Sequence, residues 1–227
     1  MSDPQVVIRE ALATGAPAAF TCSFQAEDMV VLHQIRRQLP DIPVLFLETG
    51  YHFAETYAYR DQMAKLWGLN LINVEPLVPL ATQEAQHGKL YSTDPNQCCG
   101  IRKVEPLFRS LNDYEVWFTG LRREQSPTRA GLEPFGSHRL PTGKILSKVS
   151  PLYDWTWKDV WAYMTIEEIP HLSLYDRGYT SIGCEPCTAI PESDNLRSGR
   201  WGGKKLECGI HIEAAPPSVS AGTSQEA

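Results

Sequence analysis

The sequence lacks the long apolar run that a membrane span requires. None of its apolar stretches approaches the roughly 20 consecutive residues of a transmembrane helix. Its first residues, Met1-Ser-Asp-Pro, contain no basic region, and Arg9 and Glu10 interrupt the apolar residues that follow. We therefore expect no secretion signal, no membrane partner and a cytoplasmic location.

A basic excess is also missing. Lys and Arg number 21 against 27 Asp and Glu, which gives a formal net charge of −6 over 227 residues. Proteins that bind DNA or RNA usually carry a basic surplus, so a nucleic-acid partner is not expected. Overall charge still permits a local basic pocket for one small anion. Internal repeats are absent as well, and the length fits one domain with a short extension.

Short apolar segments alternate with amphipathic ones. Strands are expected at 17–22, 44–47, 69–74 and 114–119, and a hairpin or loop at 131–148. Helices are expected at 26–39, 54–67, 99–110 and 155–164, and a first helix begins at Asp3-Pro4 and stops at Gly15. This alternation predicts an α/β fold with a mostly parallel sheet and helices on both faces. Ligands of such sheets bind at the carboxyl ends of the strands, so the turns at Ser23, Glu48 and Thr119 should line one pocket.

Cysteines carry the main chemical signal. Four of the six form two pairs, Cys98-Cys99 and Cys184-Glu-Pro-Cys187. In a reducing compartment such pairs favour metal binding over disulfides. They suit an iron–sulfur cluster or a structural zinc ion, and unligated thiols are the alternative. Adjacent cysteines favour the cluster, because their side chains diverge and each can take a different iron.

Cys208 stands apart from the pairs. Arg197, Arg200 and two lysines precede it, and His211 follows. Nearby cations lower the pKa of a thiol, so Cys208 is either a catalytic nucleophile or a surface cysteine in a basic stretch. Cys22, in an apolar strand, is expected to pack in the core.

Five motifs give the chain a specific resemblance to a known family. They are Ser23-Phe-Gln-Ala-Glu-Asp28, Leu47-Glu-Thr-Gly50, Cys98-Cys-Gly-Ile-Arg-Lys103, Gly120-Leu-Arg-Arg-Glu-Gln-Ser126 with Thr128-Arg129, and Glu207-Cys-Gly-Ile-His211. With these motifs the sequence resembles the assimilatory adenylyl-sulfate (APS) reductases of the phosphoadenylyl-sulfate reductase family. The resemblance extends over residues 18–211.

The resemblance implies a fold, a cofactor and a domain organisation. The fold is the adenine-nucleotide fold of the ATP pyrophosphatases, and a 4Fe–4S cluster is held by the two cysteine pairs. We divide the chain into a nucleotide- and cluster-binding domain (1–190), a mobile catalytic segment (191–212) and a tail expected to be disordered (213–227). Relatives with the cysteine pairs generally use adenosine 5′-phosphosulfate, and those without them use its 3′-phosphorylated form. The first substrate is therefore favoured.

The implied reaction reduces adenosine 5′-phosphosulfate to sulfite and AMP, in sulfate assimilation and cysteine biosynthesis. Cys208 attacks sulfur, and thioredoxin or a glutaredoxin-like reductant releases the S-sulfocysteine intermediate. The cluster is expected to act structurally or electrostatically. The sequence is compatible with a homo-oligomer and does not specify one.

The resemblance and the spacing to the cysteines assign roles to further residues. Donors for the developing charge are expected from Lys103, Arg197, Arg200 and His211, and substrate-binding residues are Ser23, Phe24, Gly50, Gly120, Arg122 and Arg129. The turn at Ser23 would offer backbone N–H groups to an anion, or Ser23 would simply cap the following helix.

Two departures and two other functions remain open. The family often has Asp where this chain has Glu48, and the stretch between Trp201 and Cys208 is shorter than in some relatives. An ATP-dependent adenylating or thiolating enzyme would need a Ser-Gly-Gly-x-Asp-Ser loop, which the motif at Ser23 lacks. A zinc- or cluster-binding regulatory module would have no need of Cys208.

Overall fold

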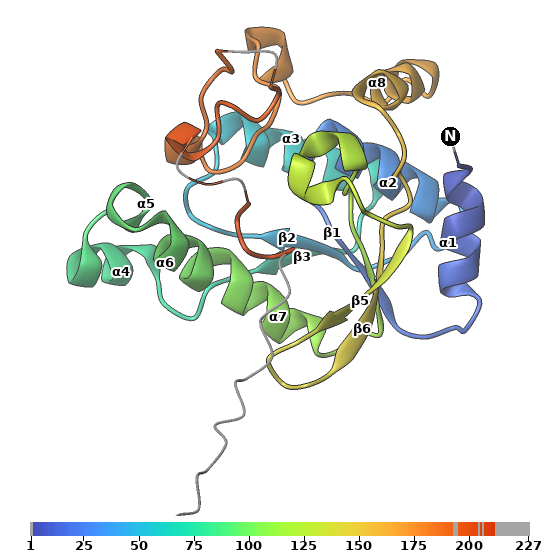
Figure 1. Cartoon of the computed structure of the whole chain (residues 1–227), viewed down its shortest axis with the longest axis horizontal. Helices are drawn as coiled ribbons and strands as arrows, with labels where there is room; N and C mark the ends of the chain where they lie inside the picture. The colour runs from blue at the N-terminus through green and yellow to red at the C-terminus, as the bar shows by residue number, and fades with distance from the viewer. Residues whose placement is uncertain (1, 193–194, 204, 206, 212–227) are drawn as a thin grey trace, which may run out of the picture.

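A six-stranded sheet forms the centre of the protein (Figure 1). The computed structural model describes residues 2–192, 195–203, 205 and 207–211. The strand order is β3 (Leu71–Val74), β2 (Val44–Leu47), β1 (Ala18–Thr21), β4 (Val116–Phe118), β6 (Ile145–Val149) and β5 (Phe135–Arg139). All neighbouring strands are parallel except β5 and β6, which form an antiparallel pair. The predicted α/β class, the mostly parallel sheet and the hairpin are confirmed.

Helices cover both faces of this sheet. On one face lie α1 (Pro4–Leu12), α2 (Ala26–Arg36), α3 (Ala54–Trp67) and α8 (Trp157–Ile166), and on the other α4 (Leu80–His87), α5 (Leu90–Thr93), α6 (Pro95–Cys99) and α7 (Glu105–Leu111) (Figure 1). Side chains of a strand alternate between the faces. In β1, Phe20 joins the core beneath α1, α2, α3 and α8, while Ala19 joins the core beneath α7. Burial on both faces explains why the central strands β1, β2 and β4 are almost uninterruptedly apolar.

The helix that carries the first cysteine pair differs from its prediction. The sequence predicts one helix from residue 99 to 110. In the structure α6 already begins at Pro95, because the Asp94 carboxylate accepts hydrogen bonds from the backbone N–H groups of Asn96 and Gln97. A π-helical turn, Gly100–Val104, then separates α6 from α7. Such wide turns occur often at functional sites, and this one contains Lys103.

Other boundaries differ by a few residues. Helix α2 ends at Arg36 rather than residue 39, β3 begins at Leu71 rather than residue 69, and α4 and α5 were not predicted. The predicted tail at 213–227 lies outside the described residues, and the division at residue 190 stays a prediction. Within the described part of the chain, no helix combines the length and apolar composition needed to cross a membrane.

Candidate active site

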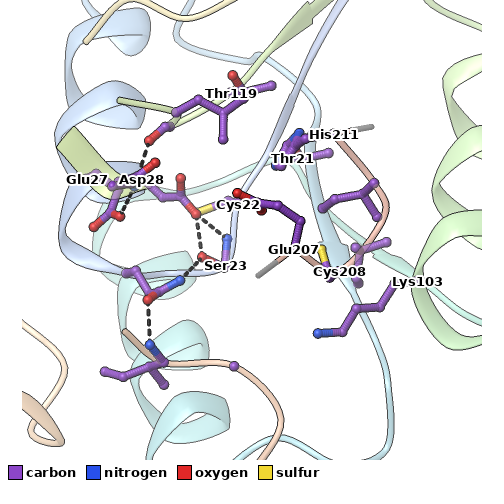
Figure 2. A pocket seen from close by; sticks show the side chains of 18 of the residues that line it. Thr21, Cys22, Ser23, Glu27, Asp28, Lys103, Thr119, Glu207, Cys208 and His211 are labelled. Atoms are coloured by element: carbon purple, nitrogen blue, oxygen red, sulfur yellow. Dashed lines mark hydrogen bonds between the residues drawn. The ribbon is translucent and has the colours of Figure 1, made fainter. Parts of the chain in front are cut away.

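A cavity lies at the carboxyl ends of β1, β2 and β4 (Figure 2). The turns after β1 and β4 contribute Ser23 and Thr119, and the end of β2 contributes Leu47. Glu48 is not part of the described lining, because its carboxylate accepts a hydrogen bond from the Tyr57 hydroxyl at 2.5 Å. The prediction that these three turns line one pocket is confirmed for Ser23 and Thr119. It is wrong for Glu48.

The turn after β1 is organised around Asp28. Ser23 donates hydrogen bonds to the Asp28 carboxylate from its backbone nitrogen at 2.6 Å and from its hydroxyl at 2.5 Å. The N–H of Ala26 donates to the Tyr175 hydroxyl at 3.0 Å. Because Gln25 is the N-cap of α2, the alternative of Ser23 as a helix cap is wrong. An anion bound by these amides would have to displace their present partners.

Three acidic residues line the cavity, and two of them, Glu27 and Asp28, are neighbours on α2. Burial raises the pKa of Asp28 to about 7, and the charge of Glu27 adds to the increase. Gly120 lies directly against Asp28: a Cβ at this position would be 2.0 Å from Oδ1 of the carboxylate. Only glycine therefore fits here while Asp28 keeps its bonds to Ser23, and the close approach explains the glycine that opens the fourth motif.

Four cationic side chains line the same cavity as the Cys208 thiol, namely Lys103, Arg129, Arg197 and Arg200. Burial alone would lower the pKa of Lys103, but the electrostatic attraction of Cys184, Cys99 and Cys208 outweighs burial and raises this pKa. Lys103 therefore stays protonated. Figure 2 shows Cys208 between the turn at Ser23 and Lys103.

Arg200 connects this cavity to the second cysteine pair. Its side chain is only 6% exposed. Its Nε donates to the carbonyl of Cys187 at 3.4 Å, and its guanidinium carbon lies 4.4 Å from the centre of the Trp201 ring. A Cβ on Gly183 would come within 2.2 Å of the guanidinium, so the glycine gives Arg200 its path into the cavity.

His211 is the last residue that the structure describes, and it packs against the sheet. Its ring stacks on Trp117 with 5.6 Å between centroids, and Lys148 donates to its carbonyl oxygen at 3.3 Å. Burial lowers the pKa of His211 well below its usual value, and the positive charge of Lys148 lowers it further. His211 is thus neutral at pH 7 and offers a hydrogen bond rather than a charge.

The four paired cysteines line a second cavity together. Cys98 and Cys99 end α6, while Cys184 directly precedes the 3₁₀ turn Glu185–Cys187 and Cys187 ends it. Burial raises the pKa of Cys98 to about 12, and the charges of the other three cysteines add to the increase. The structure thus brings together two pairs that are far apart in the sequence. Their role as metal ligands stays a prediction.

The second cavity adjoins the first. Lys103 and Trp201 line both. The Cys184 thiol donates to the Thr49 hydroxyl at 3.4 Å, which fixes this thiol beside the loop after β2. All six cysteines are free thiols. Among the described residues, no group of three or more His, Cys, Asp or Glu side chains is arranged to hold a single metal ion.

Residues 17–190 match the phosphoadenosine phosphosulfate reductase domain. The chain belongs to this reductase family. A family member from Geobacillus kaustophilus (strain HTA426), named adenosine 5′-phosphosulfate reductase, is 45% identical over 206 residues, which cover 87% of this chain and 85% of the relative. The predicted family is confirmed.

Solved structures extend the comparison. The phosphoadenylyl-sulfate reductase of Candida auris, in complex with phosphate, is 26% identical with a TM-score of 0.70, over 83% of this chain and 91% of that chain. The FMN adenylyltransferase of Candida glabrata, with FAD and pyrophosphate, has a TM-score of 0.63 at 15% identity, over 94% and 75% of the two chains. The latter similarity concerns the fold alone, and together the two confirm the predicted adenine-nucleotide fold.

Three of the predicted substrate-binding residues do not line the cavity at the carboxyl ends of β1, β2 and β4. Phe24 is buried in the core and has a positive φ of 59°. Gly50 likewise lies outside the lining, at a φ of 74°. Arg122 is 2% exposed, forms an ion pair with Glu124 at 2.8 Å and lies over the Trp157 ring. For these three residues the geometry favours structural roles, and substrate contact stays an untested prediction.

Several lining residues had been given no site role from the sequence, and Cys22 and Glu207 are two of them. Cys22, assigned to core packing, is buried but also lines the cavity. The available signal was its position, one residue before Ser23 at the carboxyl end of β1. Glu207 also lines the cavity, although its motif gave it no role.

Proposed function

We propose that this reductase converts adenosine 5′-phosphosulfate to sulfite and AMP. The observation that carries the proposal is the Cys208 thiol in one cavity with Lys103, Arg197 and Arg200, at the strand ends where this fold binds ligands. The name of the relative, adenosine 5′-phosphosulfate reductase, supports the substrate. Its sulfuryl and phosphate groups are anionic, and cationic donors form strong charge-assisted bonds to such groups.

The chemistry follows from the thiol. The Cys208 thiolate attacks the sulfuryl sulfur, the bond from sulfur to the phosphate oxygen breaks, and AMP leaves with the electron pair. An S-sulfocysteine remains on the enzyme. A thiolate of thioredoxin, or of a glutaredoxin-like protein, then attacks the Cys208 sulfur and expels sulfite. The second thiol of that reductant resolves the mixed disulfide, so the reductant supplies both electrons.

The cations have defined tasks in this scheme. Negative charge develops on the departing phosphate oxygen, and Lys103, Arg197 and Arg200 line the cavity around the thiol. One such fixed donor typically contributes about 2.7–4 kcal/mol to a transition state. His211, which is neutral, supplies a hydrogen bond. Because the nucleophile and the metal-binding thiols must stay reduced, we place the reaction in the cytoplasm. Its product, sulfite, places the enzyme in sulfate assimilation for cysteine biosynthesis.

We also propose that Cys98, Cys99, Cys184 and Cys187 hold a 4Fe–4S cluster. The donor set fits, because the four cysteines line one cavity and offer the four sulfur ligands that such a cluster needs. One zinc ion fits less well, because it needs its ligands in a tight tetrahedron and the side chains of the adjacent Cys98 and Cys99 diverge. When bound, the cluster supplies a cross-link between α6 and the turn at Glu185, and negative charge beside Lys103.

Replacing Cys99 by serine should remove the brown colour of the protein and most of its iron. The alcohol of serine is far less acidic than a thiol and a harder ligand, so it binds the iron of a cluster much more weakly. Iron per chain and absorbance in the visible range measure the loss. The matched control is Cys22→Ala, which removes a thiol outside the second cavity and should keep its iron. Full iron in Cys99→Ser would refute the ligand assignment.

The enzyme should prefer adenosine 5′-phosphosulfate over its 3′-phosphorylated form by roughly tenfold or more in kcat/KM. An added phosphate needs donors of its own, and the cavity also contains the acidic side chains Glu27 and Asp28. Sulfite release with thioredoxin, measured on both substrates under one set of conditions, tests the proposed function and this preference together. Equal efficiencies would contradict the preference, and inactivity on both would contradict the function.

A further inference from the structure

The residue directly before Cys208 is tied to the body of the protein by a two-pronged ion pair. Arg129 donates from Nε to Oε1 of Glu207 at 2.9 Å and from Nη2 to Oε2 at 2.6 Å. The two side chains are only 10% and 9% exposed. Bidentate pairs of this kind restrict orientation as well as distance. The backbone that carries Cys208 is therefore held on one side by Arg129.

Two further groups support the carboxylate. The Thr128 hydroxyl donates to Oε1 of Glu207 at 3.1 Å, and Nη2 of Arg197 lies 3.8 Å from Oε2. Burial alone would raise the pKa of Glu207, but the hydrogen bonds and charge of Arg129 outweigh burial and keep this pKa below its usual value. Glu207 is therefore ionised at neutral pH, and the ion pair is present under assay conditions.

On the other side of Cys208 the chain has an apolar attachment. Ile210 packs against the core beneath α7, and His211 stacks on Trp117. Gly209 connects the two attachments with a φ of 99°, a conformation that favours glycine. Cys208 thus lies between a polar anchor at Glu207 and an apolar anchor at Ile210 and His211, with its thiol lining the cavity.

We propose that Glu207 is a positioning residue, whose ion pair with Arg129 holds residues 207–211 against the cavity and directs Cys208 into it. The proposal rests on the proposed function in that Cys208 is the nucleophile. Without the carboxylate, only the apolar anchor remains, and the segment spends more time away from the cavity. A thiol that is less often in place reacts more slowly, although the substrate site itself is unchanged.

The first test needs no substrate. The holoenzyme is treated with iodoacetamide and digested with trypsin, and cleavage after Lys205 gives a peptide in which Cys208 is the single cysteine. In Glu207→Gln, alkylation of Cys208 should be roughly fivefold to tenfold faster than in the wild type, because the segment opens more often. The control Glu133→Gln breaks an exposed ion pair with Arg123 and should leave the rate unchanged. Equal rates in Glu207→Gln and wild type would overturn the proposal.

The second test separates positioning from general damage. Glu207→Gln should lower kcat by roughly tenfold to a hundredfold without raising KM, and Glu207→Asp should recover part of the loss because it keeps the carboxylate. Iron content should match the wild type in both variants. If the wild type forms a sulfo adduct on Cys208 and Glu207→Gln forms it equally fast, the positioning role fails. If the wild type forms no adduct, the proposed function fails, while the alkylation result stands by itself.

Discussion

Replacing Cys208 by serine should abolish sulfite production, by roughly 10⁴-fold or more, while leaving iron content and nucleotide binding intact. The thiol lines the cavity beside Lys103, and a serine hydroxyl is a far poorer nucleophile at neutral pH. Cys208 is not among the cysteines of the second cavity, so its loss should not release iron. Sulfite release and iron per chain are measured on the same preparation.

The covalent intermediate gives an independent readout of this prediction. Wild-type enzyme incubated with adenosine 5′-phosphosulfate and no reductant should gain one sulfo group, roughly 80 Da, on the peptide that contains Cys208. Cys22→Ala should still form the adduct, although Cys22 lines the same cavity. An adduct on Cys22, or an active Cys208→Ser enzyme, would overturn the mechanism. An unmodified Cys208 thiol during turnover would instead favour direct reduction without a covalent step.

Replacing Lys103 by methionine should lower kcat by roughly a hundredfold to a thousandfold. Lys103 lines both cavities, and its charge interacts with Cys184, Cys99 and Cys208. Methionine has a similar length but carries no charge, so the variant removes mainly the electrostatic contribution. Single-turnover formation of the sulfo adduct measures the effect on the first chemical step.

A matched control removes a lysine elsewhere. Lys158 is exposed on α8, outside both described cavity linings, and Lys158→Met should keep wild-type activity. Iron content shows whether Lys103→Met acts through loss of the proposed cluster. Activity of Lys103→Met within about twofold of wild type, at full iron, would show that Lys103 does not stabilise the transition state.

Much of the fold followed from local signals in the sequence. Helix α1 begins after Asp3, whose carboxylate accepts a hydrogen bond from the Gln5 N–H at 2.9 Å, as the Asp-Pro start predicts. Helix α3 ends at Gly68, which adopts the left-handed conformation with φ of 60°. Such signals act over a few residues, so a single sequence suffices to recognise them.

Predictions that depend on how side chains pack agreed less well with the structure. Arg122 belongs to a motif with a binding role, yet its side chain packs between Glu124 and Trp157. Glu48 ends a strand in the expected way, but a hydrogen bond from Tyr57 directs its carboxylate away from the cavity. In both cases the residue type was compatible with the site, and the orientation was decided by neighbours that the local pattern did not indicate.

By itself, the sequence determined the fold class, the two cysteine pairs and the isolated Cys208, because periodicity and motif spacing are properties of the chain. Only the tertiary structure decided which groups meet. It brings Arg129 to Glu207 across 78 positions of sequence, and it gathers the two cysteine pairs around one cavity. Burial and charge act through distances in space rather than along the chain. The setting of the Cys208 thiol therefore emerged only when the strands and the last segment were folded together.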